Sequence, residues 1–89
     1  MPTIAIFYGI VVQMYWRDHA PPHVHALYQG HEALIEIERG DIIGGGLPPN
    51  AHRLVRQWVL LRSEELKQNW ERGRRKEAFH RVAGPDDGR

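Results

Sequence analysis

The fold is decided by the stretch HVHALYQGHEALIEIE, residues 23–38. On both sides of Gln29-Gly30, apolar residues alternate with polar ones, which is the period of a half-buried strand. Gln29-Gly30 itself is a two-residue connection of the kind that joins antiparallel strands. The stretch therefore predicts a β-hairpin with one apolar and one polar face.

The alternation extends to the residues before this hairpin. Residues 10–17 alternate as well and predict a preceding strand, separated from the hairpin by a loop of about five residues, 18–22, that contains Pro21-Pro22. After the hairpin, Arg39-Gly40 predicts a third tight turn, and the glycines at 44–46 predict the end of regular structure. We expect an antiparallel β-meander of three to four strands.

A helical pattern follows the meander. Asn50 is a suitable N-cap, and apolar residues then recur on one side of a 3.6-residue helix as far as Trp70. Ser63 followed by two glutamates is typical of a second helix start, which predicts a kink there. The expected fold class is α+β: the meander with one long, kinked, C-terminal amphipathic helix on one face. The expected core residues are Val12, Met14, Trp16, Val24, Ala26, Ile35 and Ile37 from the sheet and Leu54, Val55, Trp58 and Leu66 from the helix.

Composition limits the class of protein. A chain of 89 residues has room for one core, and 42% hydrophobic with 26% charged residues is ordinary for a soluble globule. The absence of cysteine excludes disulfides and thiolate zinc sites and favours a cytoplasmic location. Polar Gln13 interrupts the apolar opening too early for a membrane span or a signal peptide. We expect one domain over residues 1–75 and a frayed, basic and polar tail over residues 76–89.

Chemistry is concentrated in the segment RDHAPPHVHA, residues 17–26, where three of the six histidines occur. Residues two apart on a strand share a face, so His23 and His25 are expected on the polar face, opposite Val24. Pairing across the loop sets Arg17 opposite His23 and Tyr15 opposite His25. Pairing across the turn sets His23 opposite Glu36 and His25 opposite Leu34, with Glu32 nearby and His19 overhanging from the loop.

Three interpretations of this hairpin remain open from the residues alone. In the first, His23, His25, Arg17 and Glu36 are catalytic: a carboxylate orients an imidazole for acid–base chemistry while the guanidinium stabilises an anion, as in metal-free phosphodiester cleavage. In the second, His19, His23 and His25 bind a divalent metal such as zinc. In the third, these are polar side chains of an exposed or dimer-forming sheet face.

The basic run Arg72-Gly73-Arg74-Arg75-Lys76 is a further candidate for function. Clustered cations attract RNA or DNA phosphates, but basic residues at a helix C-terminus also complement the helix dipole. We favour the second interpretation for this run. The helical spacing of Trp58 and Trp70 likewise favours core packing over base stacking.

The residues that carry a family resemblance are Met1-Pro2-Thr3-Ile4, Phe7-Tyr8-Gly9-Ile10, the signature Asp18-His19-x-Pro21-Pro22-His23-x-His25-Ala26, Glu32-Ala33-Leu34-Ile35 and Asn69-Trp70. Over roughly residues 1–75 the chain resembles the small bacterial domain of unknown function 4160. The signature residues carried over are Asp18, His19, Pro21, Pro22, His23 and His25.

The resemblance implies a component of a toxin–antitoxin module, because members of that family are commonly encoded beside another small domain family and have been proposed as parts of such modules. We therefore expect a cognate partner protein and action on RNA through the hairpin. A homodimer is expected on separate grounds, because an unpaired edge strand or the open polar face of so small a meander favours self-association. The alternative is a non-catalytic interaction module that uses the open sheet face. Whether the protein is an enzyme is not decided by the sequence.

Overall fold

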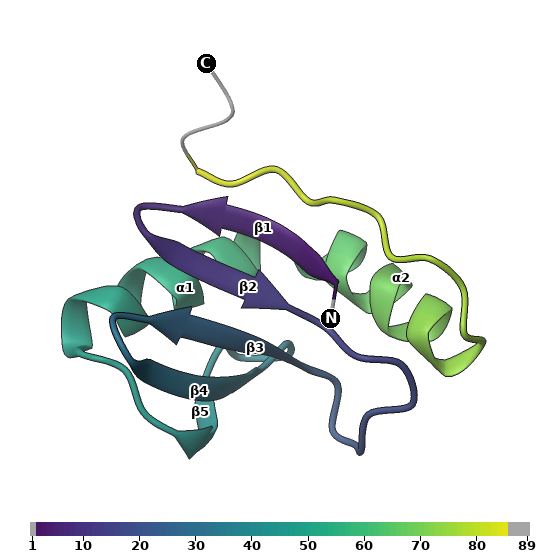
Figure 1. Cartoon of the computed structure of the whole chain (residues 1–89), viewed down its shortest axis with the longest axis horizontal. Coiled ribbons are helices and arrows are strands. Elements are labelled where there is room, and N and C mark those ends of the chain that lie inside the picture. Colours follow the sequence, from purple (N-terminus) through teal and green to yellow (C-terminus); the bar gives the residue numbers. More distant parts are fainter. Residues whose placement is uncertain (1, 86–89) are drawn as a thin grey trace.

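The computed structural model describes residues 2–85, which form one antiparallel sheet with two helices on one of its faces (Figure 1). The sheet has five strands whose spatial order follows the chain: β1 (Thr3–Phe7), β2 (Ile10–Gln13), β3 (His23–Tyr28), β4 (His31–Glu36) and β5 (Ile42–Gly45). The helices are α1 (Pro49–Leu61) and α2 (Ser63–Arg74). The α+β class is confirmed, but the sheet has five strands rather than three or four.

The additional strand is β1, which comes from the apolar opening. It pairs with β2 through a turn at Tyr8-Gly9, where both residues have positive φ. At the other edge, β5 includes Gly44 and Gly45, where we expected regular structure to end. Gly45 has a φ of +67°, and a Cβ there would collide with the backbone oxygen of Glu32, so the close approach of β4 requires glycine.

The expected single helix is two helices that meet at the predicted break. Residue Arg62 separates them, and α2 begins at Ser63 with two acidic residues in its first turn, which complement the helix dipole. Asn50 is not the N-cap of α1. The helix begins one residue earlier at Pro49, whose fixed φ suits the first helical position, and its start has no side-chain cap.

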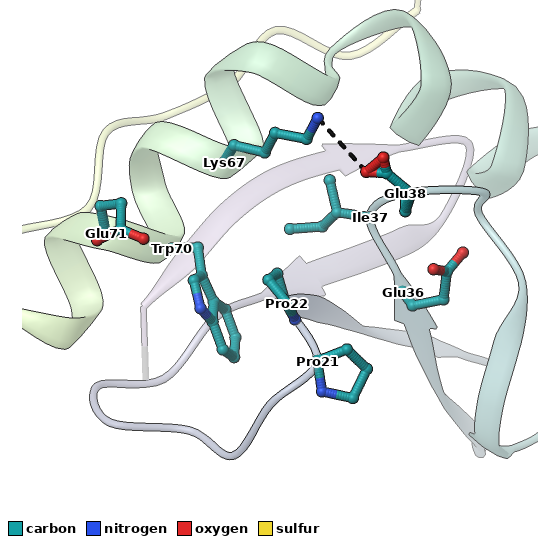
Figure 2. Close-up of a pocket in the computed structure, with 8 residues that line it drawn as sticks. All are labelled: Pro21, Pro22, Glu36, Ile37, Glu38, Lys67, Trp70 and Glu71. Atoms are coloured by element: carbon teal, nitrogen blue, oxygen red, sulfur yellow. Dashed lines mark ion pairs between the residues drawn. The ribbon is translucent and has the colours of Figure 1, made fainter.

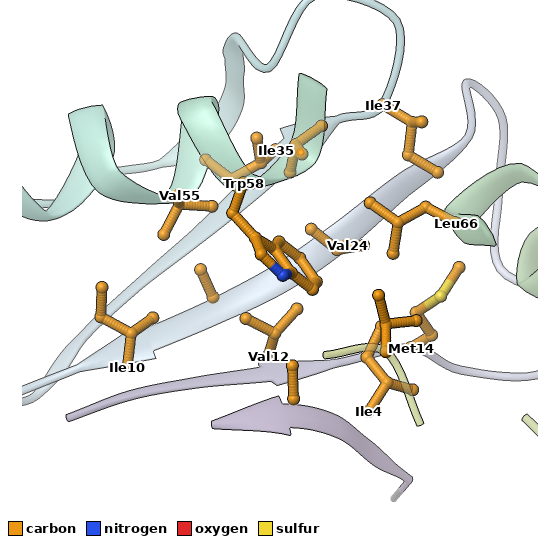
Figure 3. Packing of buried hydrophobic residues seen from close by; sticks show 14 of the residues in the cluster. Ile4, Ile10, Val12, Met14, Val24, Ile35, Ile37, Val55, Trp58 and Leu66 are labelled. Carbon is orange, nitrogen blue, oxygen red and sulfur yellow. The ribbon is translucent and has the colours of Figure 1, made fainter. Parts of the chain in front are cut away.

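The core lies between the sheet and the helices, with Trp58 at its centre (Figure 3). Trp58 is buried, and its indole N–H donates to the carbonyl of Ala83 at 2.7 Å. Of the expected core residues, Leu54 is only half-buried and Trp16 is 51% exposed. Trp16 is outside the core because β2 ends at Gln13, so the alternation that we extended to residue 17 no longer describes a strand. The other expected core residues are buried.

Part of the expected tail packs on the domain. The amide of Val82 donates to the carbonyl of Ile4 at 2.8 Å, the Asn69 side chain bonds both backbone groups of His80, and Val82 is buried. Figure 1 shows this segment running past α2 and β1. The division at residue 75 stays a prediction, and the part of the tail from residue 86 lies outside the described residues. No helix among residues 2–85 is long and apolar enough to cross a membrane.

Candidate metal centre

The loop between β2 and β3, residues 14–22, carries the first residue of the site. Two contacts hold it against the C-terminal end of α2: the Arg17 amide donates to the carbonyl of Gly73 at 3.2 Å, and the Trp16 indole donates to the carbonyl of Glu77 at 3.0 Å. Arg17 has a φ of 54°, which turns the chain there. The following residue, Asp18, is brought back over the start of β3.

The hairpin of β3 and β4 carries the two histidines. His23 pairs with Glu36 and His25 pairs with Leu34, so the register across the Gln29-Gly30 turn is confirmed. The register across the loop is wrong, because Gln13, not Tyr15, lies opposite His25. The strand that we expected to run to Arg17 ends early, and the loop is correspondingly longer.

Three side chains converge where the loop crosses this hairpin. The Oδ2 atom of Asp18 lies 3.0 Å from Nε2 of His23 and 2.8 Å from Nε2 of His25. One ligand atom from each residue lies within 4.8 Å of the others, which is the geometry of a metal-binding group. We refer to Asp18, His23 and His25 as the Asp-His-His cluster.

The outer nitrogens of both imidazoles face oxygen acceptors. Nδ1 of His23 lies 2.7 Å from the carbonyl oxygen of Pro21, and since a carbonyl only accepts, this nitrogen carries the hydrogen. Nδ1 of His25 lies 3.4 Å from a carboxylate oxygen of Glu32. At His23 the lone pair is therefore on Nε2, which points into the cluster. Nε2 of His25 instead donates to the Asp18 carboxylate at 2.8 Å, and it would lose that hydrogen on binding a metal.

Within the Asp-His-His cluster, His23 is the residue whose hydrogen bonding is incomplete. Its side chain is fully buried, and its Nε2 makes no hydrogen bond, although it lies 3.0 Å from an oxygen of Asp18. A buried polar atom without a partner is costly and rare in folded proteins. An ion bound between Nε2 and the Asp18 carboxylate would satisfy it.

The electrostatic environment of the cluster is negative. Burial by itself would raise the pKa of Asp18, but the hydrogen bond with His25, the His19 amide and the charges of His23 and His25 together lower it, so Asp18 is a carboxylate. The pKa of Tyr15 is raised, first by burial and then by the charges of Glu32 and Asp18. The Tyr15 ring packs edge-on against His25, with centroids 4.4 Å apart. These carboxylates favour a cation at the cluster.

The remaining candidate residues are not brought to the same point. The His19 side chain is 71% exposed, and its Nδ1 lies 3.4 Å from the other Asp18 oxygen. The exposed Arg17 side chain makes no ion pair with a residue in the described range 2–85. The Glu36 carboxylate accepts the backbone amides of Arg39 and Asp41 in the β4–β5 turn, at 2.6 and 3.1 Å.

Sequence reasoning did not include Asp18 among the candidate catalytic or metal-binding residues and placed it only in the loop and in the family signature. Its carboxylate within the signature Asp18-His19-x-Pro21-Pro22-His23-x-His25 was the available signal.

His23 is also part of the packing, contrary to our expectation that it lies clear of the core. Its ring contacts Trp70 of α2, with centroids 5.3 Å apart. On another side, Trp70 lines a pocket of about 290 Å³ together with Pro21 and Pro22, and the pocket is rimmed by carboxylates, one of them paired to Lys67 at 3.6 Å (Figure 2). Asp18 and His25 do not line this pocket, so it adjoins the cluster without containing it.

Comparison with known proteins identifies the family. No curated protein and no solved structure matches the chain. The model of one family, described as Domain of unknown function (DUF4160), matches residues 9–71, a range that includes the loop, the hairpin and most of both helices. The chain therefore belongs to the domain of unknown function 4160 family.

Proposed function

We propose that the Asp-His-His cluster is a divalent metal centre and that metal binding is the function of this face of the protein. The observation that carries the proposal is the buried Nε2 of His23, which makes no hydrogen bond and faces the Asp18 carboxylate. Two imidazoles and a carboxylate are ligands that suit zinc and other first-row divalent ions.

The distances and the surrounding contacts support a metal. Ligand atoms bound to a tetrahedral ion at about 2.0–2.1 Å are about 3.3 Å apart. The Asp18 oxygen lies 3.0 and 2.8 Å from the two imidazole nitrogens, so each of these two separations needs to widen by only a few tenths of an ångström. Metal-bound histidines usually donate their outer N–H to a carbonyl or carboxylate, and Pro21 and Glu32 occupy those positions.

A centre with three protein ligands retains a coordination position for water or substrate, which is the arrangement of catalytic rather than structural zinc. A metal-bound water would supply the nucleophile for hydrolysis, including that of a phosphodiester. Metal-free acid–base catalysis has less support. Among residues 2–85, the side chains of Arg17 and Glu36 make no hydrogen bond or ion pair with the histidines they were expected to assist, and Glu36 bonds backbone amides instead.

The test measures bound metal in the purified full-length chain. Elemental analysis and calorimetric titration with Zn²⁺ should give about one ion per chain, lost in Asp18→Asn and His25→Ala. His31→Ala is the matched control, since His31 is an exposed histidine at the opposite end of the same hairpin. Binding should weaken as pH falls, because protons compete for the ligand atoms.

Wild-type protein that binds neither Zn²⁺ nor Mn²⁺, or His25→Ala protein that binds as tightly as His31→Ala, would contradict the proposal. His19→Ala decides whether the exposed imidazole contributes a fourth ligand. We expect weaker binding without loss of the one-to-one stoichiometry.

A second candidate function is protein interaction through the open sheet face. The two edge strands each expose an apolar residue, Ile6 on β1 and Ile43 on β5, and an unpaired edge strand can pair with a second chain. We expect a homodimer, and sedimentation at high micromolar concentration tests it. The toxin–antitoxin role and the action on RNA stay predictions from the family resemblance, and growth on induced expression, with and without the neighbouring gene, tests them.

A further inference from the structure

A second surface lies beside the cluster and is aromatic. A groove of about 530 Å³ is lined by Pro2, Tyr15, Trp16, Ala78 and Phe79, and we call it the aromatic groove. Its volume is within the range of ligand sites. Trp16 is 51% exposed, which is unusual for so large an apolar side chain. The indole is nevertheless fixed, because its N–H donates to the carbonyl of Glu77.

Two cationic residues are held next to this groove. Arg17 follows Trp16, and Lys76 lies two residues before Ala78. Their amides donate to one acceptor, the carbonyl of Gly73, each at 3.2 Å. Both residues have positive φ, 54° for Arg17 and 57° for Lys76. Residues other than glycine rarely adopt this backbone conformation, and those that do are often found at functional sites.

Among residues 2–85, these two cations have no carboxylate partner. In the basic run, Arg74 pairs with Glu71 at 3.2 Å and Arg75 with Glu77 at 3.0 Å, whereas the Arg72 guanidinium donates to the Asn69 side chain at 2.8 Å. The side chains of Arg17 and Lys76 are exposed, and no ion pair joins them to other residues of the described part of the chain. The helix-dipole interpretation therefore accounts for part of the run, but not for Lys76.

Exposed aromatic rings beside unpaired cations match the chemistry of a nucleic-acid strand, whose bases stack while its phosphates bind Lys and Arg. We propose that the aromatic groove, with Arg17 and Lys76, binds single-stranded nucleic acid. A base stacks on Trp16, and adjacent phosphates contact the two cations. A proline-rich peptide would use the rings but leave the cations unused, so the observations favour the nucleic acid.

The groove also connects this surface with the cluster, because Tyr15 lines the groove and its ring packs on His25. A nucleic-acid strand bound in the groove would pass close to the proposed metal. Binding itself does not depend on the metal, and the two proposals are therefore tested separately.

The experiment is fluorescence anisotropy of labelled oligouridylate and oligothymidylate, each of about 12 nucleotides, with the full-length chain in EDTA at low salt. Trp16→Ala should weaken binding about tenfold or more, since one stacked base contributes that much. Leu61→Ala, which removes an exposed apolar side chain from α1, is the matched control and should bind as wild type. Trp16→Phe keeps a stacking ring and should retain most of the affinity.

The cations are tested by salt dependence. Each phosphate contact with a single strand contributes about −0.7 to the slope of log affinity against log salt, so two contacts predict about −1.4. Arg17→Gln or Lys76→Gln should each reduce the slope to about −0.7, whereas Arg53→Gln, on the exposed surface of α1, should leave it unchanged.

Several results would overturn the proposal: no binding of either oligonucleotide, the same affinity for Trp16→Ala and Leu61→Ala, or Trp16-dependent binding of a proline-rich peptide or of phosphatidylserine vesicles without binding of oligonucleotide. Similar affinity for RNA and DNA supports stacking and phosphate contacts alone, whereas preference for the RNA identifies it as the ligand. Asp18→Asn removes a proposed metal ligand but no ring that packs on Tyr15. It should lose the metal and keep oligonucleotide binding, so failure of one proposal does not imply failure of the other.

Discussion

The two ends of strand β3 are built differently. At one end, β3 passes to β4 through Gln29-Gly30, two residues with φ of 47° and 82° that close the hairpin by themselves. At the other end, residues 14–22 connect β2 to β3 and are positioned by Gly73 and Glu77, from beyond the sheet. The candidate metal centre lies at the second end. Local backbone preference fixes the turn, whereas distant contacts fix the loop that carries the chemistry.

The largest loss of stability should come from a substitution in the core, which packs beneath both ends of β3. Trp58→Ala removes a buried ring and its hydrogen bond to Ala83, and we expect unfolding to become easier by about 3–5 kcal/mol. Denaturant unfolding followed by circular dichroism measures the change. Leu61→Ala on the same helix is the control and should change stability little, because that side chain is 71% exposed. Equal stability of the two variants would mean that the core is not centred on Trp58.

At the loop end of β3, His23 should contribute to the stability of the fold as well as to the proposed metal centre. His23→Ala leaves a cavity beside Trp70, and we expect a loss of about 2–4 kcal/mol in chelator. His31→Ala at the turn end should cost much less, since that residue is exposed. If metal-free His23→Ala were as stable as His31→Ala, the buried position of His23 would be wrong.

The turn end should respond to backbone strain alone. Gly30→Ala places a side chain at a φ of +82° with open space around it, and we expect a loss of about 1 kcal/mol. Gly46→Ala is the control, because a Cβ there also meets open space and no positive φ opposes it. Thermal unfolding of both variants compares them, and no difference between the two would show that the turn tolerates a side chain.

The smallest change in stability should come from the exposed ion pair between Arg75 and Glu77, which lies beside the hydrogen bond from Trp16 to the Glu77 carbonyl. The hydrogen bond from Arg75 is the main influence on the Glu77 carboxyl and lowers its pKa. A lowered pKa stabilises the folded protein above the unfolded value of about 4.3, and this contribution disappears as pH falls through the folded pKa. Glu77→Gln should therefore lack a small acid-dependent part of the stability, visible at low salt and screened at high salt.

Acid unfolding of wild type and Glu77→Gln at both salt concentrations measures this difference. If wild type and Glu77→Gln lost stability with pH in the same way at low salt, the ion pair between Arg75 and Glu77 would not contribute to stability.

The sheet was predictable where the alternation of residues coincides with a paired strand. Val12, Val24 and Ile35 are buried as the period requires. Trp16 was misplaced because the same period continues beyond Gln13, where the strand has ended. Strand β1 was missed although Gly9 marks its turn to β2, because the apolar opening was judged only as a membrane segment.

The sequence by itself determined the β3–β4 register, the break between the helices at Ser63 and the family signature, since each depends on residues close together in the chain. Only the tertiary structure decided that Asp18 contacts both histidines, while His19 packs against His23 alone. The path of the loop depends on contacts such as that of Trp16 with Glu77, 61 residues away. Spacing along a chain reports the period of a local element, but it does not specify which distant carbonyl will hold a loop.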